Sequence, residues 1–310
     1  MMDIIRKECD FRWIALGLLM SVGAQVIRGI RWKLQLNALD VFPPLFYIIL
    51  SIFGTYAVNI VFPRLGEIWR TGYIAARQKA PFTTVFGSMI ADRLADLVLV
   101  GTLTLITFLL ASPAVVAFIQ RYPDVYNAIG AFISSPLTWG IFIALTAVCA
   151  GLYLRYNNSK LISKIRKAII ELWQGFAVVF TMKHRLVWFI LTIALWTCYF
   201  FQLYVAFFAF PFTIELIHSN GIICVLVCFV ISSIAMGIPS NGGIGPWQLA
   251  VLFSLTLYAP SGMTVAQADT FRTNITAFAN LVMGMETLLL IVLGIFTFVC
   301  IGLDKRRSNN

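Results

Sequence analysis

Charged side chains are scarce in this 310-residue sequence, which contains 23 Lys and Arg, 13 Asp and Glu, and two His. Charged residues make up 12% of the chain, whereas a typical soluble domain has about 25%. This composition excludes a typical cytosolic enzyme. It also excludes a disordered chain, because such chains combine low hydrophobicity with high net charge.

The few cysteines and histidines are scattered through the sequence. Cys224 and Cys228 would share a helix face, but His184 and His218 lie elsewhere, and two thiols are too few ligands for a structural zinc site. The scattered thiols also exclude a disulfide-rich secreted fold. We find no serine–histidine pairing, nucleotide-binding loop or metal motif. We therefore predict no catalytic residue, no metal and no cofactor.

Apolar residues are what the sequence has in abundance: they make up 60% of the chain, and the mean hydropathy is +0.89. A hydrocarbon layer of about 30 Å needs about 20 apolar residues per crossing helix. Lipid also forces such runs to be helical, because it cannot hydrogen-bond free backbone groups. We predict an all-α polytopic membrane protein with about eight transmembrane helices, at residues 13–36, 45–62, 82–110, 137–155, 187–210, 221–238, 243–258 and 274–303.

The basic residues predict an orientation, because cytoplasmic loops carry an excess of Lys and Arg. If both termini are cytoplasmic, 17 of the 23 basic residues fall in cytoplasmic segments. Arg28, Arg31 and Lys33 then lie toward the outer end of the first helix and do not follow this rule. The net charge of +10 is spread over loops without a groove-binding motif, so we expect no nucleic-acid partner.

A basic amphipathic segment divides the chain. In residues 157–186, apolar side chains recur every three or four positions and Lys160, Lys164 and Lys167 lie between them. This pattern is typical of a helix that lies in the membrane interface. We therefore describe residues 1–310 as one integral membrane domain, with a first half (1–156), a cytoplasmic interfacial helix (157–186) and a second half (187–310).

Two Pro-x-x-Gly motifs interrupt apolar runs, one starting at Pro63 and the other at Pro239, 176 residues later. Proline removes a backbone donor and glycine permits left-handed angles, so each motif predicts a broken or re-entrant helix. Paired broken helices are typical of transporters with internal repeats, where the substrate binds between them. The spacing does not distinguish a parallel from an inverted repeat, and two ordinary loop turns are the alternative.

Charged residues occur inside two of the predicted spans. Asp92, Arg93 and Asp96 lie within the third, with Asp92 about 15 Å from its start, and Glu286 lies within the last. Charges at such depth usually face a bundle interior or an aqueous cavity. Two interpretations stay open: a buried ion-pair network that only orients helices, and a polar cavity in which arginines bind a phosphate-bearing headgroup.

These motifs together resemble the lysylphosphatidylglycerol synthase transmembrane-region family of flippase-like proteins. The resemblance rests on Arg28-x-x-Arg31-Trp32, on Gly66-Glu67 with Arg70 and Asp92-Arg93-x-x-Asp96-Leu97, and on Pro239-x-x-Gly242-Gly243-x-Gly245. It implies a multi-pass protein of the bacterial inner membrane that moves or helps process a phosphate-bearing lipid. Some relatives carry an aminoacyl-transferase domain; this sequence ends at Asn310 without one, so we expect no lysyl transfer. Gln248 stands where we expect a glutamate, and Glu286 where we expect a basic residue.

We therefore predict a flippase or transporter rather than an enzyme, with a phospholipid or polyprenyl-phosphate-linked lipid as substrate. The alternative is a membrane enzyme or accessory subunit that acts on a lipid-linked envelope precursor. Expected partners are the bilayer, an anionic or phosphate-bearing lipid, and either a second copy of the chain or an envelope-biosynthesis protein. The candidate substrate-binding residues are Arg64, Gly66, Glu67, Arg70, Asp92, Arg93, Asp96, Asn241, Gly242, Gly243, Gln248 and Glu286.

Overall fold

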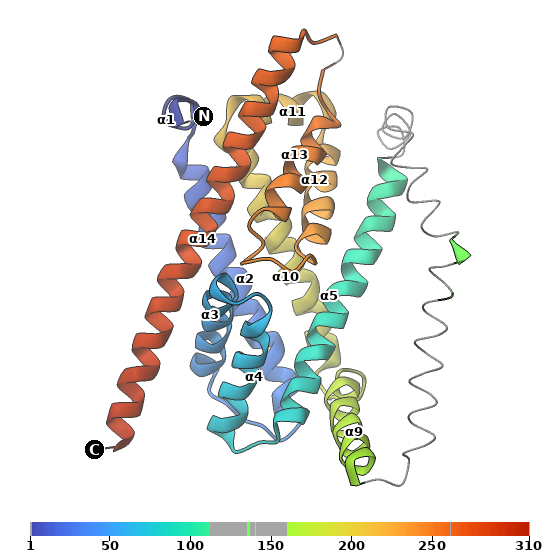
Figure 1. Cartoon of the computed structure of the whole chain (residues 1–310), viewed down its shortest axis with the longest axis vertical. Helices are drawn as coiled ribbons and strands as arrows, with labels where there is room; N and C mark the ends of the chain where they lie inside the picture. The colour runs from blue at the N-terminus through green and yellow to red at the C-terminus, as the bar shows by residue number, and fades with distance from the viewer. Residues whose placement is uncertain (1, 112–134, 137–139, 141–159, 261, 310) are drawn as a thin grey trace.

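The structure is a computed structural model that describes residues 2–111, 135–136, 140, 160–260 and 262–309. These residues form helices and no strand (Figure 1). The elements are α1 (Met2–Glu8), α2 (Phe11–Asn37), α3 (Leu45–Val61), α4 (Leu65–Gln78), α5 (Phe82–Leu110), α9 (Lys160–Thr181), α10 (Arg185–Ala206), η1 (Phe207–Ala209), α11 (Pro211–Asn220), α12 (Ile222–Ala235), α13 (Pro246–Thr256) and α14 (Val265–Asn309).

Four of these helices are long and apolar enough to cross a membrane: α2, α5, α10 together with η1, and α14. The number becomes five if α11 and α12, which meet at an angle of 111°, form one bent crossing. Their outward faces carry exposed Leu105, Leu109, Ile193 and Ile295, which suits contact with lipid chains. The chain is therefore a multi-pass membrane protein whose described secondary structure is helical throughout.

The predicted number of eight transmembrane helices is not confirmed. Residues 45–62, 221–238 and 243–258 form α3, α12 and α13, which have only 17, 14 and 11 residues, fewer than the about 20 of a typical crossing helix. The predicted span at 137–155 lies outside the described residues. The extra helix α11 was not predicted, and α14 begins nine residues before its predicted start.

The motif at Pro63 does break a helix. α3 ends at Val61, Arg64 adopts a left-handed φ of 66°, and α4 starts at Leu65. Tyr47, near the start of α3, and Arg77, near the end of α4, both contact Asp304. The two helices therefore form a hairpin that returns to the end of the bundle where it began.

The motif at Pro239 forms the turn of a second hairpin, between α12 and α13. Gly242, Gly243 and Gly245 have φ values of 64°, 88° and 94°, which L side chains rarely adopt. The open ends of this hairpin pack in one apolar cluster with Phe207 and Phe210, at the opposite end of the bundle from Asp304. The two hairpins therefore enter from opposite ends (Figure 1), as expected of an inverted rather than a parallel repeat.

The two chain termini also lie at opposite ends of the bundle (Figure 1). The amide of Asp10 donates to the carbonyl of Ala209 over 2.9 Å, beside the cluster that contains Phe278. From Phe278, α14 runs 26 residues, about 39 Å, to Asp304 beside α3 and α4. The prediction that both termini lie on one side of the membrane is therefore not confirmed.

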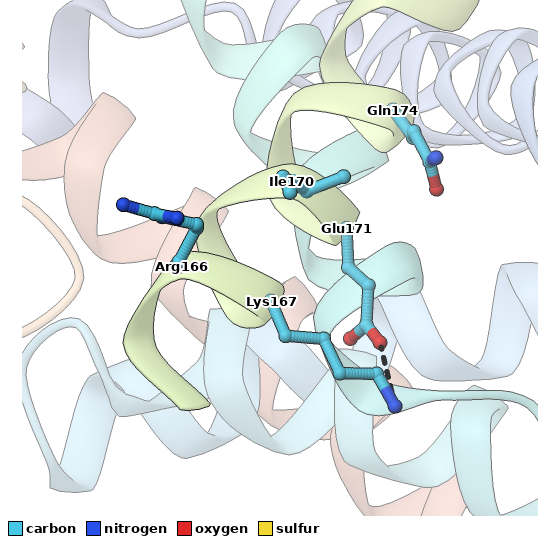
Figure 2. Close-up of a pocket in the computed structure, with 5 residues that line it drawn as sticks. All are labelled: Arg166, Lys167, Ile170, Glu171 and Gln174. Atoms are coloured by element: carbon cyan, nitrogen blue, oxygen red, sulfur yellow. Dashed lines mark ion pairs between the residues drawn. The ribbon is translucent and has the colours of Figure 1, made fainter. Parts of the chain in front are cut away.

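The predicted interfacial segment contains α9, which packs along the start of α5 at the lower end of Figure 1. Gly175 permits this close packing, since a Cβ there would lie 2.8 Å from the backbone of Gly87 and Ser88. Trp173 and Phe180 point away from the bundle and are exposed. A pocket of about 380 Å³ lies on the same helix. Figure 2 shows the five residues that line it, among which Lys167 pairs with Glu171 at 4.0 Å. Exposed aromatic and basic side chains on one helix suit an interfacial position.

Candidate functional site

The tips of the two hairpins meet inside the bundle. The amide of Gly242 donates to the carbonyl of Asn59 over 3.1 Å. From the other tip, Arg64 donates to the carbonyls of Met236 and Gly237 over 3.2 and 2.5 Å. Residues 172 to 183 apart in the sequence thus form one junction, which we call the hairpin junction (Asn59–Glu67 and Met236–Gln248).

Glycine at the first tip allows the two arms of the α3–α4 hairpin to touch. A Cβ at Gly66 would overlap the carbonyl oxygen of Thr55 and the side chain of Asn59. The amide of Gly66 donates to the Asn59 side chain over 2.8 Å, and that side chain donates to Glu67 over 3.2 Å. Gly66 is thereby a packing residue that positions Asn59 and Glu67.

We expect Gly66→Ala to destabilise the protein by about 1–3 kcal/mol, because overpacking forces the two arms apart. Gly72→Ala on the same helix is the matched control, since its Cβ would meet no atom within 4 Å, and alanine favours a helix by about 1 kcal/mol. Thermal unfolding of both purified variants in detergent measures the difference. Equal melting temperatures for the two variants would contradict the close packing at Gly66.

Four buried charges join α2 to α5. Arg28 lies 3.3 Å from Asp92 and 3.0 Å from Asp96, and Arg31 lies 2.6 Å from Asp92 and 3.0 Å from Asp96. The side chains of Arg31 and Asp92 have no exposed area, and those of Arg28 and Asp96 have 4% and 12%. Each carboxylate therefore faces two arginines, and we call these four residues the α2–α5 charge cluster.

Helix α10 closes the third side of this cluster. The Tyr199 hydroxyl lies 3.3 Å from Arg28, the Thr192 hydroxyl accepts from Arg31 over 3.2 Å, and the Trp196 ring nitrogen donates to Asp96 over 3.2 Å. These neutral partners add hydrogen bonds to a buried ionic group, which such groups need to offset the loss of hydration. The cluster thus holds α2, α5 and α10 in one arrangement.

A second ion pair links the cluster to the hairpin junction. Arg93 donates to Glu67 over 2.8 Å and lies 3.9 Å from Asp96. The Arg93 side chain is 36% exposed, so this part of the network is accessible whereas the α2–α5 charge cluster is enclosed. The charges therefore run continuously from the enclosed cluster to the tip of the α3–α4 hairpin.

Arg70 is a buried cation without an anionic partner. It is 0% exposed, its guanidinium lies over the Trp32 ring at 4.4 Å, and none of its three nitrogens has a hydrogen-bond partner in the described residues. A cation over an aromatic face gains at most about 2 kcal/mol, far less than the cost of dehydrating it. In the described region, the arginines Arg28, Arg31, Arg70 and Arg93 thus outnumber the carboxylates Glu67, Asp92 and Asp96 by one positive charge.

The other candidate residues lie around the second hairpin and on α14. Gln248 accepts from the amide of Gly245 over 2.5 Å and donates to Asn280 over 3.3 Å. A Cβ at Gly243 would lie 2.7 Å from Cε of Met236, and Asn241 is exposed beside it. Glu286 makes no described contact with the arginines; its partners are Ser21 and Gln202. The structure therefore brings eleven of the twelve candidates to the junction and its network, and places Glu286 apart.

An apolar groove lies beside the first hairpin. It has a volume of about 580 Å³ and runs between α3, α4 and α14. Phe62 and Leu65, which form part of its wall, flank Arg64 at the tip. The full lining consists of Ala57, Val58, Val61, Phe62, Leu65, Ile68, Trp69 and Phe298. An apolar surface thus borders the polar junction.

Sequence reasoning missed most of the partners that hold the charges. Arg28 and Arg31 were placed only toward the end of the first helix and in one of the motifs that resemble the family. Their spacing of three residues nevertheless places both side chains on one helix face. Asn59, Ser21, Tyr199 and Gln202 carry no sequence signal, because single polar residues in apolar helices are common. Only the fold shows that Asn59 meets Glu67, that Ser21 and Gln202 meet Glu286, and that Tyr199 meets Arg28.

Comparison with known proteins gives one match. The family model described as the lysylphosphatidylglycerol synthase TM region matches residues 5–284. No curated protein matches the sequence, and no solved structure matches it either. The matched range includes both hairpins and the charged residues that join them, but Glu286 and Asp304 of α14 lie beyond it.

Proposed function

Because the chain belongs to the lysylphosphatidylglycerol synthase transmembrane-region family, we propose that it is a translocase that moves a phosphate-bearing lipid across the bacterial inner membrane. The substrate is a phospholipid or a polyprenyl-phosphate-linked lipid. One observation carries this proposal: two hairpins from opposite ends meet at their tips, and one of them carries the buried Arg70, which forms no ion pair or hydrogen bond among the described residues.

The excess positive charge supports a phosphate ligand. Arg70 keeps all of its donor nitrogens unused, and a guanidinium binds phosphate through short, charge-assisted hydrogen bonds. A phosphate that reached Arg70 would supply the missing negative charge. In this proposal Arg64 and Arg93 guide the headgroup, and Glu67, Asp92 and Asp96 balance the surrounding arginines.

The apolar groove supports a lipid rather than a water-soluble anion. It lies next to the junction and is lined by apolar side chains from α3, α4 and α14. A hydrocarbon chain in this groove would stay out of water while its headgroup enters the junction, with a gain of about 0.8 kcal/mol for each CH₂ group buried. Movement of one hairpin tip past the other would then expose the headgroup to the second side.

We propose that the end of the bundle with Arg77, Lys79, Lys183 and the C-terminus faces the cytoplasm. This end carries most of the basic residues, as the positive-inside rule requires. The N-terminus then lies on the outer side, and Lys33 lies at the cytoplasmic end of α2 in agreement with the rule. In this proposal α9 rests on the cytoplasmic leaflet.

Reconstitution tests the proposal. The purified protein is incorporated into vesicles that contain phosphatidylglycerol with a fluorescent acyl chain, and a membrane-impermeant reductant quenches the probe in the outer leaflet. We expect the quenched fraction to rise from about half toward completion, because lipid from the inner leaflet becomes accessible. Quenching that stops at half, both with this lipid and with a labelled polyprenyl phosphate, would contradict translocation. A lipid of changed mass would instead favour the enzyme alternative.

A further inference from the structure

Glu286 is the one candidate carboxyl that meets only neutral partners among the described residues. The Ser21 hydroxyl lies 2.6 Å from one carboxyl oxygen, and the Gln202 amide nitrogen lies 3.0 Å from the other. Ser21 belongs to α2, Gln202 to α10 and Glu286 to α14. A single carboxyl therefore joins three of the four long helices.

The position of this carboxyl makes its ionised form costly. Glu286 lies near the middle of the 40-residue apolar stretch Val265–Asp304, and an ionised group at such depth needs a counter-charge or water. The contacts given for Glu286 in the described part of the chain include no basic side chain. Its protonated form fits the same contacts, because Ser21 can accept from the carboxyl O–H while Gln202 donates to the other oxygen.

The ionisable groups on the neighbouring helices are engaged elsewhere. On α2 the next one is Arg28, two turns from Ser21 and paired with Asp92 and Asp96. On α10 they are Arg185 at its first position, which donates to the carbonyl of Phe180, the thiol of Cys198, Tyr199, which lies against Arg28, and Tyr204, which stacks on Phe200. The ionisable groups of α3 are Tyr47, which binds Asp304, and Tyr56. Helix α13 contains no ionisable group. Helix α1 carries Arg6, Lys7 and Glu8 near the N-terminal end of the chain.

We propose that Glu286 is a proton-binding site and that its proton travels with the lipid. This inference rests on the proposed function. In the described conformation the carboxyl is protonated and allows α14 to pack against α2 and α10. Loss of the proton to water, which breaks one O–H bond and leaves a carboxylate, favours hydration and separates α14 from these helices. One proton carried with one anionic headgroup offsets one of its negative charges.

Infrared difference spectroscopy tests protonation without reference to transport. The spectrum of the wild-type protein minus that of Glu286→Gln, both in vesicles at neutral pH, should contain the C=O stretching band of a protonated carboxyl. Asp269→Asn replaces an exposed acid on the same helix. The spectrum of the wild-type protein minus that of Asp269→Asn should lack this band. A carboxylate pair of bands from Glu286 at neutral pH would overturn the proposal.

The coupling is tested by the vesicle assay with an imposed pH gradient. For one proton per lipid, each pH unit should shift the distribution of the labelled lipid by a factor of about ten. Glu286→Gln should still exchange lipid but give the same distribution with and without the gradient, and Glu286→Asp should restore a response. A full response in Glu286→Gln, or none in the wild type while lipid moves, would overturn the coupling but leave translocation intact. Absence of any lipid movement would instead count against the proposed function.

Discussion

Replacing Asp92 with asparagine should cost about 3–5 kcal/mol of stability, because it leaves buried arginines without a counter-charge. The Asp92 side chain has no exposed area and lies 2.6 Å from Arg31 and 3.3 Å from Arg28. Asparagine keeps the shape of the side chain but removes its negative charge. Thermal unfolding in detergent, followed by circular dichroism, should show a large drop in melting temperature or failure to accumulate folded protein.

Two variants separate this effect from a general loss of acidic charge. Asp269→Asn, at an exposed position, should change the stability by less than about 0.5 kcal/mol. The double variant Asp92→Asn with Arg31→Gln should recover part of the loss, since it removes a cation together with its anion. If Asp92→Asn unfolds at the same temperature as Asp269→Asn, the α2–α5 charge cluster does not hold these helices.

Replacing Arg70 with glutamine should slow lipid movement about 10- to 100-fold, the loss expected for one or two charge-assisted hydrogen bonds to phosphate. The same change should leave stability unchanged or raise it, because Arg70 has no anionic partner to lose. The vesicle assay measures the first effect, and thermal unfolding measures the second. A stabilised but inactive protein would identify Arg70 as a residue kept for its ligand.

Two further arginine variants sharpen this test. Arg70→Lys keeps the charge but not the planar group, so it should retain part of the activity. Arg272→Gln, at an exposed position on α14, should move lipid at the wild-type rate. Arg70→Gln with full activity would remove Arg70 from the lipid pathway. Arg70→Gln that unfolds as readily as Asp92→Asn would show instead that Arg70 is a structural residue.

The sequence predicted individual helices well where a long apolar run has clear punctuation. Residues 82–110 were predicted and observed as α5 with identical bounds, because Pro81 precedes a long, mostly apolar run that contains no further proline. The breaks at Pro63 and Pro239 were also predicted, since proline and glycine limit the backbone locally. Local chemistry was sufficient in each of these cases.

The sequence could not predict which side each segment enters from. Hydropathy gives a similar signal for a crossing helix and for the arm of a hairpin, so α3, α12 and α13 were counted as full spans. The partners of Asp92 were likewise out of reach, because Arg28 lies 64 residues away. Such pairings depend on how helices rotate and pack, which composition does not encode.

The central claim is that lipid passes where the two hairpin tips meet. Arg64 and Met236 contact each other in the hairpin junction. In a variant without native cysteines, both residues are replaced with cysteine, and the two new thiols are joined by a short, cleavable cross-linker. We expect efficient cross-linking and a stop in lipid movement that cleavage of the linker reverses. Cross-linked protein that still moves lipid at the uncross-linked rate would contradict the claim.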